Sequence, residues 1–300
     1  MSIVATPECS PCLNCLAEVT LRSVCALRAT DGPARFTIAE CPACGVLRTL
    51  PVPDELAPFY ATDLARTMHT AGNAMHERLR RLLLRREARR VTASNERGAF
   101  LDVGCGDGSF ALLLHQSGHT VIAADAAAEP PPMIAGTISY RTVDFEHGEI
   151  AGLAAGRYTV VLRHVLEHVR HPRRFLARLV EHGATRFYIV LPNSASLERR
   201  LLGTWWYLWD PPRHLWHFDA SSLRTLLATL GLEVVARGYD TIPNLVPSVY
   251  RLLRVRGWSS FLYQPFGPRS MLTGLSAPLN LLVPHNVLWM VARARASRPR

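Results

Sequence analysis

The sequence predicts an α/β protein with a mostly parallel central sheet, preceded by a small cysteine-rich module. Beyond residue 98, short apolar runs alternate with helical patterns, and strands that alternate with helices form parallel sheets covered on both faces. The module is predicted from two C-x-x-C pairs near the start of the chain. With 300 residues, 48% of them hydrophobic, the chain is long enough to bury a core.

Changes in composition divide the chain into three parts. We expect a zinc-binding module over residues 1–52, a helical linker over 53–97 and one α/β domain over 98–300. Residues 241–285 are apolar and proline-rich. This composition suggests an insertion in the domain that serves as a lid or a substrate-binding segment.

The cysteine pairs have the spacing of a metal site. Cys12 and Cys15 form the first pair, and Cys41 and Cys44 form the second about 25 residues later, a pattern typical of a tetrahedral zinc site built from two knuckles. Gly45 supplies the positive φ that a knuckle turn needs. Four thiolates leave no coordination position open, so the expected zinc is structural. Two other cysteines could replace one of these ligands: Cys9 and Cys25.

Five strands are predicted in order in the α/β domain. Their ranges are 99–104, 120–125, 138–144, 158–165 and 186–192. Helical patterns lie between most of them, for example FALLLHQSG and PRRFLARLVEHG. Parallel sheets of this kind bind ligands at the carboxyl ends of their strands, so we expect the functional site at that edge.

A glycine-rich turn follows the first of these strands. The stretch LDVGCGDGSF places Gly104, Gly106 and Gly108 just after Asp102. A nicotinamide site requires G-x-G-x-x-G, and here the third glycine is displaced. The turn therefore points away from a dinucleotide ligand.

The D-V-G-C-G-D-G sequence instead resembles the first motif of class I S-adenosylmethionine (SAM) dependent methyltransferases. The resemblance implies a Rossmann-like fold with a seven-stranded, mostly parallel sheet. It also implies that the first two glycines approach the amino acid part of SAM and that Asp102 helps to hold its ammonium group. By the same resemblance Asp125 would bind the ribose hydroxyls, Asp144 with Phe145 would contact the adenine, and His164 would lie beside SAM.

Segments further along the chain resemble the small-molecule branch of this family. They are RHVLEHVRHP and the pattern P-N…R-H-L-x-x-F…S-L-x-x-L-L that follows it. The resemblance covers residues 99 to about 240 and extends more loosely to the end. It implies two last strands, LEVVARGY and NVLWMVARA, the second inserted antiparallel. Zinc knuckles ahead of such a domain are similar to those of sugar C-methyltransferases of antibiotic deoxysugar pathways.

Two histidines are candidates for the catalytic base. Methyl transfer needs an aligned nucleophile, a base for its proton and exclusion of water. His214 lies in an H-L-x-x-F setting similar to that of the sugar C-methyltransferases, and imidazole titrates near neutral pH; His168 is the second candidate. Those enzymes have a glutamate where this chain has Arg213, which suits a carboxylate or phosphate of the substrate. We therefore expect O-methylation in preference to C- or N-methylation.

A second constellation consists of His164, Glu167 and His168. Their spacing would put all three on one face of a helix, where they could bind a divalent metal, as a similarly placed acidic cluster does in ubiquinone-pathway O-methyltransferases. The alternative is that His164 lies beside SAM while the other two cap or pack the next segment. An aromatic group could equally line a substrate pocket or belong to the core: Trp205, Trp206, Tyr207, Trp209 and Trp216.

The charge of the chain bears on its partners. The net charge of +10 comes from 34 basic residues, all arginine, which indicates compositional bias as much as selection for a polyanion. We expect a small-molecule acceptor such as a natural product, sugar or lipid-linked precursor, and not nucleic acid. The basic pattern HERLRRLLLRREARRV, with an apolar stripe through Leu79, Leu82 and Leu83, is either a solvated face or a surface for phosphates or anionic lipid. The sequence leaves peripheral membrane contact and the oligomeric state open.

The remaining expectations concern location and other functions. The first residues lack the pattern of a secretory leader, and the late apolar segment LSAPLNLLVPHNVLWMVARA is interrupted by prolines and polar residues. We expect a cytoplasmic protein with reduced thiols. Two alternative functions stay open: an rRNA or tRNA methyltransferase with a zinc knuckle, and a SAM-binding partner subunit without catalysis.

Overall fold

The computed structural model describes most of the α/β domain and of the cysteine-rich module. The described residues are 10–29, 34–60, 74–93, 98–242, 248 and 285–294. The predicted insertion over 241–285 lies almost entirely outside them, and so does Cys9.

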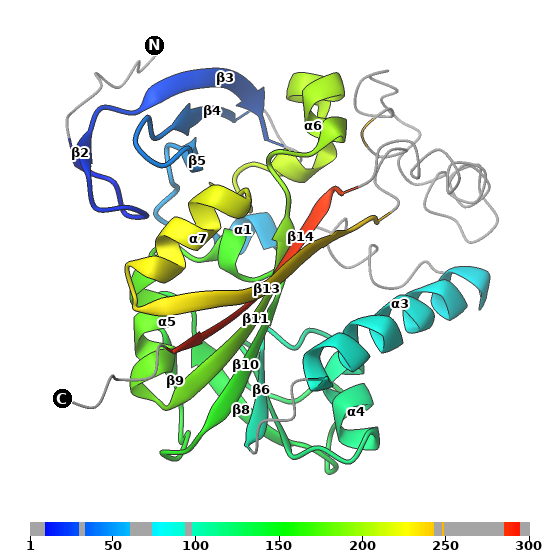
Figure 1. Cartoon of the computed structure of the whole chain (residues 1–300). Helices are drawn as coiled ribbons and strands as arrows, with labels where there is room; N and C mark the ends of the chain where they lie inside the picture. Colours follow the sequence, from blue (N-terminus) through cyan, green and yellow to red (C-terminus); the bar gives the residue numbers. More distant parts are fainter. Residues whose placement is uncertain are drawn as a thin grey trace.

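The centre of the molecule is an eight-stranded sheet with the order β13-β14-β11-β10-β6-β7-β8-β9 (Figure 1). The five predicted strands are its parallel centre. They are β6 (Ala99–Val103), β7 (Val121–Asp125), β8 (Ser139–Asp144), β10 (Tyr158–Arg163) and β11 (Ala184–Pro192). Every end lies within two residues of its predicted position. The predicted fold class, an α/β methyltransferase-type sheet, is confirmed.

Three further strands complete the sheet. β14 (Val287–Ala294) lies antiparallel between β11 and β13 (Leu232–Asp240), as predicted. The prediction of seven strands was wrong by one, because β9 (Glu149–Ile150) adds a short antiparallel hairpin beside β8. A strand of two residues has no periodicity that a sequence could reveal.

Helices cover both faces of this sheet (Figure 1). One face packs against α3 (Ala74–Thr92) and α4 (Ser109–Gln116), and the other against α5 (Pro172–Glu181) and α7 (Ala220–Ala228). Alternate strand residues supply the two cores. On β10, for example, Val161 belongs to the α3 side and Leu162 to the α5 side.

The cysteine-rich module forms a second, four-stranded sheet that includes a strand of the α/β domain. Its order is β12-β5-β4-β3, from β3 (Arg22–Arg28), β4 (Arg35–Glu40), β5 (Leu47–Leu50) and β12 (Trp216–His217). A further pair, β1 (Ser10–Pro11) and β2 (Glu18–Val19), carries the first knuckle. Cys12, Cys41 and Val46 belong to the same buried cluster as the leucines of α7. The module and the domain therefore share one core.

The basic helix α3 buries a different face from the predicted one. Leu82 and Leu83 are exposed, whereas Leu84, Ala88 and Val91 are buried against the sheet. Because the buried residues recur at i, i+4 and i+7, they form one stripe, and the arginines surround it. Within the part of the chain that the structure describes, no helix is long and apolar enough to cross a membrane.

Candidate active site

The glycine turn between β6 and α4 has two packing glycines and one that borders open space. All three have positive φ. A Cβ on Gly104 would lie 2.4 Å from Val165 Cγ2, and one on Gly108 would lie 2.7 Å from Ile134 Cγ2. A Cβ on Gly106 would have no heavy atom within 4 Å. Only the backbone of Gly106 is therefore free to be approached by a ligand.

Asp102 is buried in β6 without a hydrogen-bond donor for one of its oxygens. The residue is 2% exposed, and its Oδ2 has no hydrogen-bond partner among the described residues. Burial raises the pKa of this carboxyl to about 7, although the nearby Arg163 opposes the shift. A buried, unsatisfied carboxylate oxygen is a site for a cationic donor, and the ammonium group of SAM is one.

The acidic residues at the ends of β7 and β8 are engaged by nearby backbone amides. Asp125 accepts hydrogen bonds from the amides of Gly106 at 2.8 Å and Ala126 at 2.7 Å. Asp144 closes the turn after β8 and is 2.7 Å from His147 Nδ1. Asp102, Asp125 and Asp144 thus stand near the carboxyl ends of three adjacent strands, where the sequence predicted the cofactor.

Two other predicted cofactor residues have different surroundings. Phe145 stacks on Phe175 with ring centroids 5.9 Å apart, so one of its faces is covered by α5. His164 follows β10 directly, with a φ of 55°. This left-handed conformation ends the strand earlier than predicted and turns the chain toward Glu167, whose Oε1 lies 3.4 Å from His164 Nδ1.

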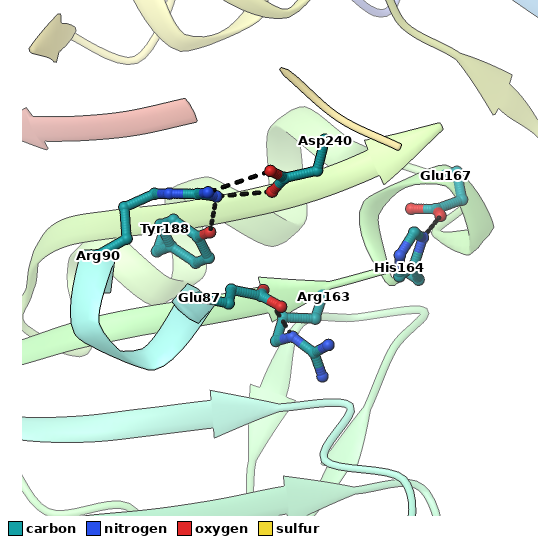
Figure 2. A network of polar contacts seen from close by, with 7 residues as sticks. All are labelled: Glu87, Arg90, Arg163, His164, Glu167, Tyr188 and Asp240. Carbon is teal, nitrogen blue, oxygen red and sulfur yellow. Dashed lines mark hydrogen bonds and ion pairs between the residues drawn. The ribbon is translucent and has the colours of Figure 1, made fainter. Parts of the chain in front are cut away.

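Helix α3 is bound by ion pairs to the cofactor edge of the sheet. The pairs are Arg80 with Asp107 at 2.6 Å, Glu87 with Arg163 at 2.7 Å, and Arg90 with Asp240 at 2.7 Å. Figure 2 shows Glu87 and Arg90 reaching from the helix to side chains of different strands. The guanidinium of Arg90 also stacks over the Trp289 ring at 4.3 Å. These contacts link α3 to the glycine turn, β10 and β13.

A second cluster, which we call the histidine cluster, consists of Glu167, His168 and His214. One ligand-type atom from each residue lies within 4.8 Å of the others. Glu167 is 1% exposed, and apart from the 3.4 Å ion-pair contact of its Oε1 with His164 Nδ1, neither carboxylate oxygen has a hydrogen-bond partner among the described residues. The rings of His168 and His214 meet edge to face, with centroids 4.7 Å apart. The predicted group of His164, Glu167 and His168 is thus joined by a histidine from a distant loop.

Backbone carbonyls orient both imidazoles of the cluster. His168 Nδ1 donates to the Arg213 carbonyl at 2.9 Å, and His214 Nδ1 donates to the Leu208 carbonyl at 2.8 Å. Because a carbonyl can only accept, each Nδ1 carries a proton, and in the neutral ring the lone pair is then on Nε2. Burial lowers the pKa of His168 to about 4, and the repulsion that a protonated His214 would exert acts in the same direction. His168 is therefore neutral at physiological pH.

Arg213 and the aromatic group have structural partners. The Arg213 guanidinium binds Asp210 through two hydrogen bonds, of 2.9 and 2.6 Å. The sequence suggested that this guanidinium binds an anionic group of the substrate, but here it binds the carboxylate of Asp210. Trp206 and Trp209 are buried against Leu27 and Ile38 of the cysteine-rich module. These two tryptophans belong to the core between the module and the domain.

The four predicted metal ligands come together. Cys12 Sγ lies 3.9 Å from Cys44 Sγ, and Cys15 Sγ lies 3.8 Å from Cys41 Sγ. Four sulfurs about 2.3 Å from a tetrahedral zinc are about 3.8 Å apart, so the cluster has the dimensions of a zinc site. Asn14 donates to Cys44 Sγ at 3.3 Å, a contact that favours the thiolate form.

A comparison with protein-family models identifies the family to which this chain belongs. Residues 62–237 match the model of a family described as a methyltransferase domain. The chain belongs to this family. The match spans the glycine turn, the acidic strand ends and the histidine cluster, so the protein is a methyltransferase. No curated protein matches the chain.

Solved structures of methyltransferases match the chain at low sequence identity. Magnesium protoporphyrin IX methyltransferase from Synechocystis PCC 6803, with bound S-adenosylhomocysteine, is 13% identical; the match covers 79% of this chain and 97% of that one, with a TM-score of 0.50. The 1,6-didemethyltoxoflavin-N1-methyltransferase of Burkholderia thailandensis is 17% identical over 87% and 96% of the chains, with a TM-score of 0.47. A putative sarcosine dimethylglycine methyltransferase from Galdieria sulphuraria is 14% identical over 73% and 86%, with a TM-score of 0.46.

Sequence reasoning missed two residues that contact the histidine cluster or the loop that carries it. The hydroxyl of Tyr60, in α1 (Ala57–Tyr60), lies 3.0 Å from His168 Nδ1. Thr49 on β5 donates to the His214 carbonyl at 2.7 Å. Both precede the family's glycine turn by 40 residues or more and lie in no motif. The folding of the module, and of the segment that follows it, against the domain brings them to the cluster.

Proposed function

We propose that this methyltransferase transfers the methyl group of SAM to an oxygen of a small-molecule acceptor, with His214 as the general base. The observation that carries the proposal is the orientation of His214. Its Nδ1 is bound to the Leu208 carbonyl, so its Nε2 can accept a proton within a buried cluster. An imidazole held in one tautomer by a backbone carbonyl is a prepared base.

The acceptor class is inferred from the burial of this cluster. His214 is 8% exposed and Glu167 is 1% exposed. An acceptor atom has to enter a recess to reach either, which a small molecule does more readily than a base within a nucleic acid. The absence of lysine among the basic residues also argues against a surface selected for a polyanion.

The residues divide the work of the reaction between them. Bound SAM supplies a methyl group on a positively charged sulfur. Asp102 would hold its ammonium group, and the backbone at Gly106 would let it approach. His214 Nε2 would take the acceptor's hydroxyl proton as the oxygen–methyl bond forms and the methyl–sulfur bond breaks, its electron pair staying on sulfur. The buried Glu167 would stabilise the imidazolium that results, and the neutral His168 would not repel it.

The test first identifies the acceptor and then measures the turnover of a His214 variant with it. Comparing the metabolites of cells with and without the protein, for pairs that differ by one methylene, should identify the acceptor. With it, His214→Ala should lower turnover by about a hundredfold to ten-thousandfold, the usual contribution of a general base. The SAM dissociation constant, measured by isothermal titration, should be unchanged. His115→Ala, an exposed histidine on α4, is the matched control.

Two outcomes would count against this assignment. Full activity in His214→Ala would transfer the role of base to His168. Binding of SAM without methylation of any acceptor would instead favour the partner-subunit alternative.

One observation favours a second version of the chemistry. Two histidines and a carboxylate with unsatisfied oxygens form a common ligand set for a divalent cation, and each histidine donates its other N–H to a carbonyl, as metal-binding histidines do. Glu167, His168 and His214 would hold the ion, which would lower the pKa of a bound acceptor hydroxyl. Loss of turnover on chelation, while the four-cysteine zinc stays bound, would favour this version over the free base.

A further inference from the structure

The loop that carries His214 is bound on one side by the cysteine-rich module. Thr49 on β5 makes two hydrogen bonds to it: the side-chain hydroxyl donates to the His214 carbonyl at 2.7 Å, and the backbone amide donates to the Leu215 carbonyl at 3.0 Å. Thr49 is fully buried. A single module residue therefore holds two consecutive carbonyls at the catalytic position.

A third contact of Thr49 makes its hydroxyl the middle member of a series of hydrogen bonds. His217 Nε2 lies 3.0 Å from Thr49 Oγ1. Because the hydroxyl proton is used on the His214 carbonyl, His217 has to be the donor. Burial lowers the pKa of His217 well below its usual value, so the ring is neutral and has one proton to give. The hydrogen bonds therefore run from His217 to the Thr49 hydroxyl and from that hydroxyl to the His214 carbonyl, and all three residues are buried.

The opposite side of the loop is bound by the α/β domain. The Leu215 amide donates to the Glu167 carbonyl at 2.8 Å, and Trp216 Nε1 donates to the Val169 carbonyl at 2.9 Å. The loop is therefore held between the two parts of the molecule. Without the module, Thr49 and its two bonds would be lost and the His214 carbonyl would keep no donor among the described residues.

The four-cysteine site controls where β5 lies. The second knuckle leads directly into this strand, and it is closed by hydrogen bonds from the Cys41 amide to the Val46 carbonyl and from the Gly45 amide to the Cys41 carbonyl. Asn14, in the first knuckle, donates both to Cys44 Sγ and, at 3.1 Å, to the Ser222 carbonyl in α7. The site thus connects the start of β5 to the domain.

We propose that the cysteine-rich module helps to form the acceptor site by fixing the position of His214. Thr49 is the positioning residue through which the module holds the His214 backbone. The metal bound by the four cysteines sets the position of β5, and β5 sets the position of the His214 backbone. The inference rests on the proposed function in taking His214 as the group that meets the acceptor. The position of His214 itself can be measured without any acceptor.

The test follows the His214 imidazole by NMR in protein labelled at histidine Cε1. His214→Gln identifies the signal. Thr49→Val removes the hydroxyl at nearly constant volume, so we expect the His214 signal to shift or split, and Thr49→Ser to restore it. Thr37→Val, a change of the same kind on the neighbouring strand β4, is the matched control. SAM affinity by isothermal titration should be unchanged in all three variants. Once the acceptor is known, kcat of Thr49→Val should fall about tenfold, the effect of one hydrogen bond.

The outcomes separate this inference from the proposed function. A His214 signal that is the same in Thr49→Val and in the unchanged protein would overturn the positioning role, whatever His214 does in catalysis. Loss of the four-cysteine metal in Cys41→Ser should shift the His214 signal while SAM still binds, and an unshifted signal would overturn the role of the metal. If Cys41→Ser also abolishes SAM binding, the comparison of Thr49→Val with Thr49→Ser decides. Full activity in His214→Ala would refute the proposed base and leave the positioning result intact.

Discussion

Gly106 is the glycine of the turn whose lack of a side chain leaves its backbone open to a ligand. Gly104 and Gly108 have neighbours that a Cβ would meet at 2.4 and 2.7 Å, whereas a Cβ at Gly106 would enter open space. The three glycines of this turn are therefore required for different physical reasons. Packing inside the protein requires the outer two, whereas we propose that access of the cofactor to the backbone requires the middle one.

Replacement of Gly106 should separate cofactor binding from stability. Gly106→Leu should weaken SAM binding about tenfold or more, because the side chain would occupy the space beside the turn. Gly118→Leu is the matched control: its φ is also positive, at 86°, and it too has open space around a Cβ. Both variants should lose about 1–2 kcal/mol of stability to the left-handed backbone. Equal SAM affinity in the two, by isothermal titration, would remove Gly106 from the cofactor site.

Asp102 should make SAM binding depend on pH. Burial raises its pKa to about 7, so acid converts it to a neutral group that does not attract an ammonium. SAM affinity should therefore rise as the pH increases from about 5.5 to about 7, below the range in which the amino group of SAM itself titrates. The sign for folding is opposite: a raised carboxyl pKa contributes stability at low pH that is lost as the pH rises through about 7. Asp102→Asn should bind SAM weakly and with a flat pH profile, and a slope that persists in this variant would contradict the assignment.

At the scale of elements, two short segments after β10 and before β12 set the positions of the residues in the histidine cluster. The left-handed His164 ends β10, and a single 3-10 turn, Leu166–His168, then directs Glu167 and His168 inward. The i, i+3, i+4 spacing predicted a shared helical face, but three residues of 3-10 helix do not form one. The third member, His214, lies in the loop just before β12, whose two residues pair with the module. Local periodicity could not show this pairing, because it joins segments about 170 residues apart.

At the scale of the whole molecule, the four-cysteine site lies in the core that the module shares with the domain. We expect one zinc per chain, held by the four cysteines whose sulfurs already have tetrahedral separations. Cys41→Ser or chelation should lower the melting temperature, because a structural zinc contributes directly to folding. Cys25→Ser, on β3 of the same module and outside the cluster, should leave zinc content unchanged. Elemental analysis that finds no zinc in protein purified without chelators would contradict the prediction.

The sequence by itself determined the sheet, the glycine turn and the four cysteines. These features are local: strands of alternating or continuous apolar residues, glycines at fixed intervals and C-x-x-C pairs each leave a pattern within a few residues. The parallel strands predicted a site at the edge where their carboxyl ends meet, and the resemblance to class I methyltransferases assigned Asp102, Asp125 and Asp144 to it.

Only the tertiary structure decided which histidines meet and what holds them. His214 joins Glu167 and His168, Thr49 reaches His214 from β5, and Arg213 is taken by Asp210. Each of the first two contacts links segments that are far apart in sequence, and the third depends on the conformation of one loop. The physical reason is that packing of the module against the domain, and not any local preference, sets these distances. The same packing buries Trp206 and Trp209 in a core, although the sequence allowed them equally in a pocket.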